Sequence, residues 1–348
     1  MQAQLEAKKN PLSLAFAIPD HPWTDSIDGA AVRIAMTVGG LNIKSGRLMQ
    51  VIKETASKNL QDEIDVKLHE KRGHLFANLR IGANVTDIQI LQSNIRVSQR
   101  GFELGNSGFI IEKEDYKNTL FKSEEIDPKS IRLYRNGRDI TEKPRNNRVI
   151  DVYGYSESDL QEKLPEIYQW LLERVKPERL YNRDPKLRKY WWLHRRSRED
   201  LRKMLSDIPR FIATSETMKH RVFVFLDKSI LPDNMLVNIA LSNTYSLGVL
   251  SSKVHCLWAL TIGSNLGPTP RYNKTRCFET FPFPDASETQ QATIRELAER
   301  LDAHRKRQQE QHPDLTLTGM YNVLEKLRAE EPLTAKEKTI HEQGLVSV

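Results

Sequence analysis

The stretch that decides the fold is residues 222–262, VFVFLDKSILPDNMLVNIALSNTYSLGVLSSKVHCLWALTI. Three apolar runs lie within it, at 222–226, 235–241 and 254–262. Short apolar runs that contain β-branched and aromatic residues and are separated by turn residues are typical of buried strands. We therefore expect three strands of a mixed sheet and an α/β fold for this part of the chain.

Toward the N-terminus the apolar spacing changes to that of helices. Residues 157–176 and 197–206 predict two helices, and Pro177 is expected to end the first, because a proline in a helix interior lacks the amide hydrogen that the helix needs. The apolar stripe of the first helix repeats every three or four residues and consists of Leu160, Leu164, Ile167, Leu171 and Val175.

The first 150 residues favour strands. Residues 41–150 alternate short apolar runs with turn signals such as Asn136-Gly137 and Asn146-Asn147, which indicates a β-rich, irregular segment. Residues 30–38, AAVRIAMTV, form an apolar run between glycine-containing turns. Because residues 1–28 offer too little for the rest of a sheet, we expect 30–38 to be a buried strand whose neighbours are missing.

The C-terminal end is expected to be helical. After the sequence FPFP at 281–284, helix formers predominate, and two capping boxes are present, Ser287 with Gln290 and Thr334 with Glu337. A capping box satisfies two backbone amides that a helix start leaves without partners. The whole chain is therefore predicted to be α/β, with a mixed α+β domain followed by an α-helical C-terminal region.

Composition excludes several classes of protein. The 348 residues are 39% hydrophobic, enough for a real core, and carry a net charge of +7. Cys256 and Cys277 are too few for a secreted disulfide framework and have no zinc-type spacing, so we expect two buried thiols. No apolar run reaches 18 residues, and a cytoplasmic protein without a membrane span is expected.

The strongest local signal is the charge of residues 179–221, which we call the basic tract. It holds 13 Lys and Arg residues and five acids, so it accounts for the whole positive excess. Lys and Arg neutralise nucleic-acid phosphates and release counterions. The candidate DNA contacts in the tract are Lys186, Arg188, Lys189, Arg195, Arg196, Arg198, Arg202 and Lys203.

Aromatic residues lie inside the basic tract, among them Trp191 and Trp192. Both tryptophans are interpreted as core residues in preference to base-stacking ones. The alternative to DNA contact is a plain basic surface whose tryptophans pack inward.

A second candidate for DNA contact is the polar, basic segment just before the Phe-Pro turn. Arg side chains suit guanine edges and Asn side chains suit adenine edges. A phosphate clamp or a simple connector is the alternative interpretation. The residues of this segment are Arg271, Tyr272, Asn273, Lys274 and Arg276.

Catalytic motifs are not found in the sequence. A methyltransferase of the doubly wound type needs a glycine-rich turn after its first strand, and none follows a strand-like run here. The nearest match to an Asn-Pro-Pro-aromatic tetrapeptide is Asn10-Pro11-Leu12-Ser13, interpreted as a turn before a strand. The acid-rich run at 112–115 is interpreted as a solvated surface rather than a nuclease site. We expect no catalytic residue, metal site or cofactor site in this chain.

Several long blocks resemble MmeI-like (Type IIL) restriction-modification methyltransferases. The block at 190–260, YWWLHRRSREDLRKMLSDIPRFIATSETMKHRVFVFLDKSILPDNMLVNIALSNTYSLGVLSSKVHCLWAL, and RYNKTRCFETFPFP at 271–284 resemble their target-recognition domain. Residues 17–39, AIPDHPWTDSIDGAAVRIAMTVG, resemble the last strands of their catalytic domain, and 314–348 resemble their C-terminal helices. The proline turn and the helix after it also resemble the specificity subunits of Type I systems.

The resemblance implies a division into domains. It implies a remnant of the catalytic domain at 1–40, a connector at 41–94, a DNA target-recognition domain at 95–285 and a helical spacer at 286–348. It also implies relatives that bind S-adenosylmethionine and methylate adenine at N6 in a defined double-stranded DNA site. In this chain the catalytic domain is expected to come from an upstream segment or a separate chain.

Two other hypotheses stay open at this point. The first is a non-catalytic interaction protein or defunct gene fragment, which an unpartnered strand at 30–38 would favour. The second is an intact enzyme with an unfamiliar site.

Overall fold

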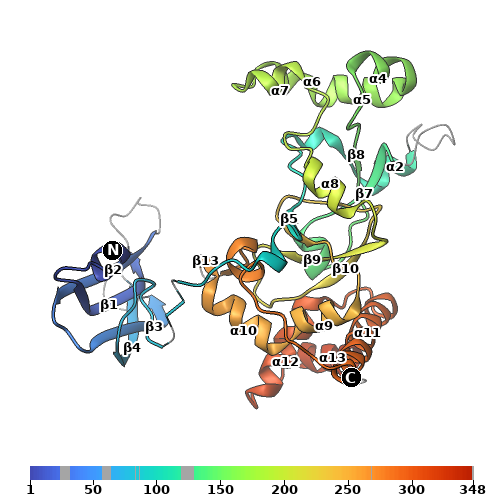
Figure 1. Cartoon of the computed structure of the whole chain (residues 1–348). Helices are drawn as coiled ribbons and strands as arrows, with labels where there is room; N and C mark the ends of the chain where they lie inside the picture. Colours follow the sequence, from blue (N-terminus) through green and yellow to red (C-terminus); the bar gives the residue numbers. More distant parts are fainter. Residues whose placement is uncertain are drawn as a thin grey trace. The chain divides into compact units, whose positions relative to one another are not determined.

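The computed structural model describes residues 1–23, 32–56, 64–82, 84–85, 87–118, 129–267 and 269–346. The chain divides into two compact units, Met1–Gln89 and Ile90–Val348. Figure 1 shows the elements of both units coloured along the chain. Each unit is described by itself below.

The N-terminal unit is built around one four-stranded sheet, in the order β2-β1-β3-β4. Strand β1 pairs antiparallel with β2 and parallel with β3, which pairs antiparallel with β4. Its small core includes Leu14, Ala17, Leu48 and Leu75. The elements are α1 (Gln2–Leu5), β1 (Leu12–Trp23), β2 (Val32–Leu41), β3 (Gly46–Ala56) and β4 (Ile64–Gly73).

The prediction of a buried, unpartnered strand at 30–38 is wrong. Residues 32–38 lie in β2, an edge strand that is largely exposed and has β1 as its partner; residues 30 and 31 lie outside the described residues. A strand was expected after the turn at Asn10-Pro11, but it was not recognised as the partner of 30–38. Its full length was also missed, because Pro19 and Pro22 cannot donate to a β-ladder. No structural break occurs at residue 40, since β2 continues to Leu41.

The second unit holds two further four-stranded sheets, in the orders β10-β9-β12-β5 and β11-β7-β8-β6, and the hairpin β13-β14. The first is antiparallel throughout, whereas β7 and β11 pair parallel. The predicted mixed α+β fold is therefore confirmed. The strands are β5 (Ser98–Arg100), β6 (Ile110–Ile111), β7 (Ile131–Arg135), β8 (Arg148–Ile150), β9 (Arg210–Ser215), β10 (Val224–Asp227), β11 (Leu231–Pro232), β12 (Leu236–Ile239), β13 (Ser264–Leu266) and β14 (Thr269–Arg271).

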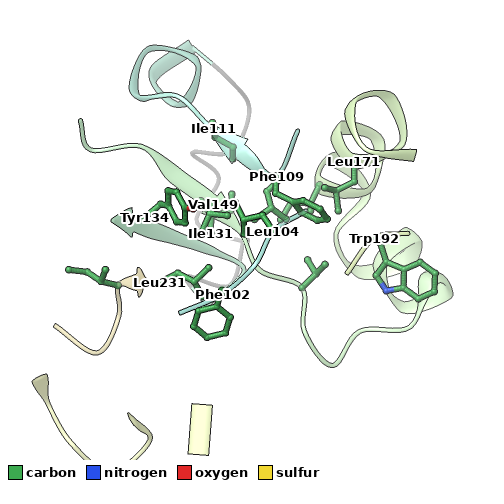
Figure 2. Packing of buried hydrophobic residues seen from close by; sticks show 14 of the residues in the cluster. Phe102, Leu104, Phe109, Ile111, Ile131, Tyr134, Val149, Leu171, Trp192 and Leu231 are labelled. Atoms are coloured by element: carbon green, nitrogen blue, oxygen red, sulfur yellow. The ribbon is translucent and has the colours of Figure 1, made fainter. Parts of the chain in front are cut away.

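One apolar core joins the two larger sheets of this unit to the helices beside them. Figure 2 shows Phe109, Val149 and Ile131 in its middle, with Leu171 of α5 (Pro165–Arg174) beside Phe109. Trp191 and Trp192 are buried in the same core, as the sequence predicted. Each indole N–H has an acceptor: Glu157 Oε1 at 3.1 Å for Trp191 and the carbonyl of Tyr155 at 3.0 Å for Trp192.

The helix predicted at 157–176 is three helices. They are α4 (Glu157–Lys163), α5 (Pro165–Arg174) and α6 (Lys176–Leu180). Pro177 lies in the first turn of α6 instead of ending the preceding helix, because the first turn leaves its amides without intrahelical partners and so tolerates proline. The helix predicted at 197–206 is confirmed as α8 (Glu199–Leu205).

The strand expected at 254–262 is wrong: α10 (Lys253–Ile262) is a helix. The Ser252 hydroxyl accepts the amide of His255 at the helix start. Apolar runs of this length fit a partly buried helix as well as a strand. The two other runs do contain strands, β10 and β12, although β10 begins two residues later than the run.

The C-terminal helices begin at the predicted capping boxes. Ser287 caps α11 (Glu288–Gln311) and Thr334 caps α13 (Ala335–Gly344), with α12 (Leu317–Arg328) between them. Helix α11 lies close to α9 (Thr244–Ser251) because Gly248 has no side chain; a Cβ there would be 2.6 Å from Ile294 Cγ2. Among the described residues, no helix is long and apolar enough to span a membrane.

Candidate nucleic-acid interface

The structure divides the basic tract into buried and exposed cations. Arg179 is fully buried, and its Nη2 donates to the carbonyl of Leu104 at 2.8 Å. Burial lowers the pKa of its guanidinium. Arg179 is therefore part of the interior and does not lie on the surface where DNA could bind.

Arg202, a predicted DNA contact, is held internally. Its Nη1 and Nη2 donate to the two oxygens of Asp151 at 2.8 and 2.7 Å, and Arg132 approaches the same carboxylate at 3.4 Å. The rings of Phe102 and Tyr153 lie on the guanidinium, with centroids at 4.7 and 4.5 Å. Both oxygens of the buried Asp151 carboxylate are engaged by Arg202, whose guanidinium joins α8 to the end of β8.

The Asp151 carboxylate is the charge that permits this arrangement. Burial acts to raise its pKa, but the hydrogen bonds from Arg202 and the charges of Arg202 and Arg132 outweigh it, so the pKa is lowered. The carboxylate is thus ionised at neutral pH, and its side chain is only 4% exposed.

The other predicted cations of the tract lie at the surface. Arg195 and Arg196 share Glu103, at 3.0 and 3.1 Å, and keep more than half of their side chains exposed. Arg198 donates to the carbonyl of Gly101 at 3.0 Å. Lys203 pairs with Glu199 one helical turn away, at 2.8 Å.

Helix α7 (Pro185–Lys189) presents three exposed cations, Lys186, Arg188 and Lys189. Arg188 donates to the backbone carbonyls of Asn182 and Arg183, and Lys189 lies 5.2 Å from the ring centroid of Tyr190. Within the described part of the chain no carboxylate pairs with any of these three side chains. Helix α7 is therefore the part of the tract whose charge is left for an external anion.

The segment predicted at 271–276 also divides. Tyr272 is 1% exposed, and its hydroxyl lies 2.9 Å from His255 Nε2, so its prediction as a DNA contact is corrected: the ring belongs to the core. The Asn273 side chain accepts the amide of Thr275 and so caps the helical turn η4 (Lys274–Phe278). Lys274 pairs with Glu279 at 2.6 Å, whereas Arg276 is exposed.

The carboxylate that positions Arg271 was not identified from the sequence. The Glu216 carboxylate, 5% exposed, accepts Arg271 at 2.8 Å through one oxygen and Arg100 at 2.7 Å through the other. These three residues are far apart in the chain, and no local motif pointed to them. Two arginines on one carboxylate leave a net positive charge at the end of β9.

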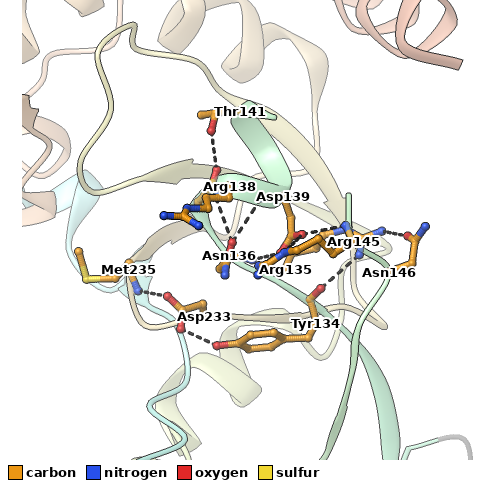
Figure 3. Close-up of polar contacts among 11 residues, drawn as sticks. Tyr134, Arg135, Asn136, Arg138, Asp139, Thr141, Arg145, Asn146, Asp233 and Met235 are labelled. Atoms are coloured by element: carbon orange, nitrogen blue, oxygen red, sulfur yellow. Dashed lines mark hydrogen bonds and ion pairs between the residues drawn. The ribbon is translucent and has the colours of Figure 1, made fainter. Parts of the chain in front are cut away.

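A polar hollow of about 460 Å³ lies beside this charge group. Ser215 and Thr217, the chain neighbours of Glu216, line it together with Asn136, Arg138 and Lys219. Figure 3 shows the hydrogen bonds that hold two of the lining residues: Asn136 accepts the amides of Arg138 and Asp139, and Asp233 accepts the hydroxyl of Tyr134. The Asn136-Gly137 pair, predicted as a turn, starts α3 (Gly137–Thr141) with a capping box.

Asp139 and Arg145 stabilise the same loop. Arg145 donates to the two Asp139 oxygens through Nε and Nη2, each at 3.0 Å. By contrast, the exposed Arg138 guanidinium has no side-chain acceptor among the described residues. The hollow thus combines fixed polar groups with the unpaired charge of Arg138 and the exposed Lys219, whose ammonium contacts Asn322 at 2.6 Å.

The stretches interpreted as non-catalytic have surface positions. Asn10 has a left-handed φ of 52° and precedes β1 with Pro11, as expected of a turn before a strand. The acidic side chains of Glu112, Glu114 and Asp115 are exposed. Among the described residues, no three His, Cys, Asp or Glu side chains gather in a way that could hold a metal ion. Both cysteines are free thiols; Cys277 is buried and Cys256 is partly so.

These features define an α+β module with exposed cations on α7 and a polar hollow at the ends of its strands. The sequence profile described as "MmeI, target recognition domain" matches residues 85–285, more than half of the chain. The chain therefore belongs to the MmeI target-recognition domain family. No curated protein matched the chain.

Solved structures share the fold. The structure of the Type IIL restriction-modification enzyme MmeI in complex with DNA matches 95% of this chain with a TM-score of 0.69 and 17% sequence identity. The type IIG restriction endonuclease BpuSI covers the same share with a TM-score of 0.35 and 11% identity, too low to support an argument. The chain spans 42% of the length of either protein.

Removal of the Asp151 charge is expected to destabilise the second unit. In Asp151→Asn, two guanidiniums lose their buried counter-charge, which costs about 3–5 kcal/mol of unfolding free energy. Because the folded-state pKa of Asp151 lies below its ordinary 3.8, its stabilisation is complete above that value and is lost as the pH falls through the folded-state pKa. Urea unfolding between pH 7 and pH 2 measures both effects.

The matched control for this substitution is Asp314→Asn, on a carboxylate that is 98% exposed. No change in unfolding midpoint is expected for it. An Asp151→Asn variant as stable as the parent at pH 7 would contradict the structural role of this carboxylate.

Proposed function

We propose that this chain is the DNA sequence-recognition portion of a site-specific DNA N6-adenine methyltransferase of a restriction-modification or phage-defence system. The observation that carries the proposal is family membership over residues 85–285. The MmeI structure that shares the fold is a complex with DNA. The exposed cations of α7 supply the physical basis for binding a polyanion.

In the proposed complex, two sets of residues have different roles. Lys186, Arg188 and Lys189 of α7 contact phosphates and fix the position of the duplex, since phosphate contacts carry no sequence information. The hollow beside Glu216 and Arg271 faces base edges. The Arg271 side chain is already held by its ion pair with Glu216. It therefore loses little further side-chain entropy when it binds a base.

The methylation step is proposed to occur in a catalytic domain supplied by an upstream segment or a separate chain, into which the target adenine is flipped. A site for S-adenosylmethionine of the doubly wound type needs a glycine-rich turn between a parallel strand and a helix. In the described residues, β7 leads into α3 through Asn136, and α3 has only five residues, of which Gly137 is the first. This turn does not fit the cofactor, and we assign no step of the reaction to this chain.

The alternative function, an interaction protein or defunct fragment without DNA activity, was favoured by an unpartnered strand at 30–38. Because β2 pairs with β1 over most of its length, that observation no longer supports it. The alternative and the proposal differ in the strength and salt dependence of DNA binding.

Binding to duplex DNA is expected to weaken steeply with salt. In the triple variant Lys186→Gln, Arg188→Gln and Lys189→Gln, the slope of log K against log salt concentration should become less negative by about 0.9 for each phosphate that is no longer neutralised. This slope is measured by fluorescence anisotropy with a labelled duplex at salt concentrations from about 50 mM to about 200 mM.

The control carries the same change in charge on α11: Arg295→Gln, Arg300→Gln and Arg307→Gln. Its slope should stay close to that of the parent chain. Equal slopes for the two triple variants would show that total charge rather than α7 governs binding, and weak salt-independent binding by the parent would favour the alternative function.

Arg271→Ala is expected to change sequence preference rather than general affinity. Removing one interaction with a base edge costs about 1–3 kcal/mol of discrimination at one position, while the salt slope changes little. Selection from a random duplex library should therefore give a consensus that is relaxed at one position, whereas the α7 variant should keep the full consensus. An unchanged Arg271→Ala consensus would exclude this arginine from base reading.

The purified chain alone is expected not to transfer a labelled methyl group from S-adenosylmethionine to DNA, because its described residues do not form the cofactor turn. Addition of a segment that carries the glycine-rich and Asn-Pro-Pro-aromatic motifs should give N6-methyladenine, detected by mass spectrometry of the digested DNA. Robust turnover by the chain alone would instead support an intact enzyme with an unfamiliar site.

A further inference from the structure

A second cavity, of about 600 Å³, lies within the Ile90–Val348 unit. Met218 and Lys219 line both this cavity and the proposed base-reading hollow, but the other lining residues differ. It is lined by the loop between β9 and β10, by the C-terminal end of α9, and by α10, α11, α12 and α13. Its volume falls within the range of small-molecule sites, about 300–1,000 Å³.

The charged residues that line the cavity are unbalanced. Five cationic side chains face one carboxylate, that of Glu325, which lies 3.2 Å from His220 Nδ1. Lys219, Lys253 and Arg328 are exposed, whereas Arg305 is buried and Arg221 is partly buried. Buried charges in folded proteins are ordinarily paired, so Arg221 and Arg305 are the unusual members of this set. The five cations are Lys219, Arg221, Lys253, Arg305 and Arg328.

Arg305 is the most deeply placed of them. It is 4% exposed, and its Nη1 donates to the carbonyl of Phe223 at 3.0 Å while Nη2 donates to the hydroxyl of Tyr321. Its Nε is buried without an acceptor. In the described part of the chain no carboxylate pairs with it: Asp302, one turn away on α11, pairs with Lys306 at 2.6 Å.

Arg221 is the second unpaired guanidinium. Its Nη1 donates to the Thr214 hydroxyl at 3.1 Å and to the carbonyl of Ser215, and the Tyr272 ring centroid lies at 4.8 Å. The described residues offer it no carboxylate. Burial lowers its pKa to about 10, so it remains charged at neutral pH without a counter-ion.

Both guanidinium-bearing residues line the cavity, and so does Cys256. Burial raises the pKa of the Cys256 thiol, and the charges of Arg221 and Arg305 act against that rise. Much of the remaining lining is apolar and includes Leu260, Leu301 and Leu324. A cationic end and an apolar body are thus present in the same cavity.

We propose that this cavity binds an organic anion, a molecule with an apolar or aromatic body and one carboxylate, sulfonate or phosphate group. The anionic group offsets the charges of Arg221 and Arg305, and the body displaces water from the leucine side chains. The site is separate from duplex binding through α7, and its occupation does not depend on the proposed function.

The test uses two fluorescent probes that share an aromatic body. The purified chain is titrated with 8-anilinonaphthalene-1-sulfonate and with N-phenyl-1-naphthylamine, which lacks the sulfonate. Saturable binding of one sulfonate probe per chain is expected, about tenfold tighter than the uncharged probe, because a charge-assisted contact is worth that factor or more. Equal affinity for both probes would overturn the proposal.

Substitutions of the lining residues test whether the probe binds in this cavity. Arg221→Met and Arg305→Met should each weaken sulfonate binding about tenfold and leave uncharged-probe binding unchanged. Lys253→Gln with Arg328→Gln, both on exposed residues at the cavity, gives a second variant that does not threaten the fold. Arg307→Gln, an exposed cation of α11 that does not line the cavity, is the matched control. Insensitivity to both sets of cavity variants would overturn the proposal.

Two further measurements separate this site from DNA binding. Bound sulfonate probe should slow alkylation of Cys256, with Cys256→Ser as the blank. An excess of duplex DNA should leave the probe bound. Displacement of the probe by duplex, together with weaker DNA binding by Arg221→Met, would show a phosphate-contact surface and overturn the proposal, whereas failure of DNA binding alone would leave it intact.

Discussion

A guanidinium inside a protein needs an acceptor, and this constraint governs how the basic tract is arranged. Asp151 at the end of β8 accepts Arg202 from α8 and Arg132 from β7, so one buried carboxylate joins a helix to two strands. Glu216 does the same for Arg100 and Arg271 from β5 and β14. Replacing such a carboxylate would leave uncompensated charges, which is costly in a low-dielectric interior.

Once these arginines are paired, the positive charge that remains is divided between the interior and the surface. Arg179 and Arg305 are buried and donate to backbone carbonyls instead of carboxylates. The cations of α7 are exposed and have no carboxylate partners in the described residues, and those at 195 and 196 share one glutamate. The family match over 85–285 assigns that module to target recognition, and the proposal of DNA binding rests on the two together.

The C-terminal helices contribute more than a rigid extension. Helix α11 buries Asp302, His304, Arg305 and Gln308 on the side where a helix of this length would ordinarily bury leucines. Two residues of this polar face, His304 and Arg305, line the cavity between α10, α11 and α12. The same unit thus contains a largely apolar cavity with cationic residues next to its polar strand-end hollow, and Met218 and Lys219 line both.

The sequence by itself determined the elements with local signals. Capping boxes placed the starts of α11 and α13, a short apolar run indicated β12, and charge counting found the basic tract, because each depends on neighbours in the chain. Tertiary structure alone decided the helical state of 254–262, the partner of β2 and the burial of Tyr272. It also decided the pairing of Arg202 with Asp151 and of Arg271 with Glu216. These depend on contacts between residues tens to hundreds of positions apart, and the free energy of burying an apolar or charged group is set by those contacts rather than by the adjoining sequence.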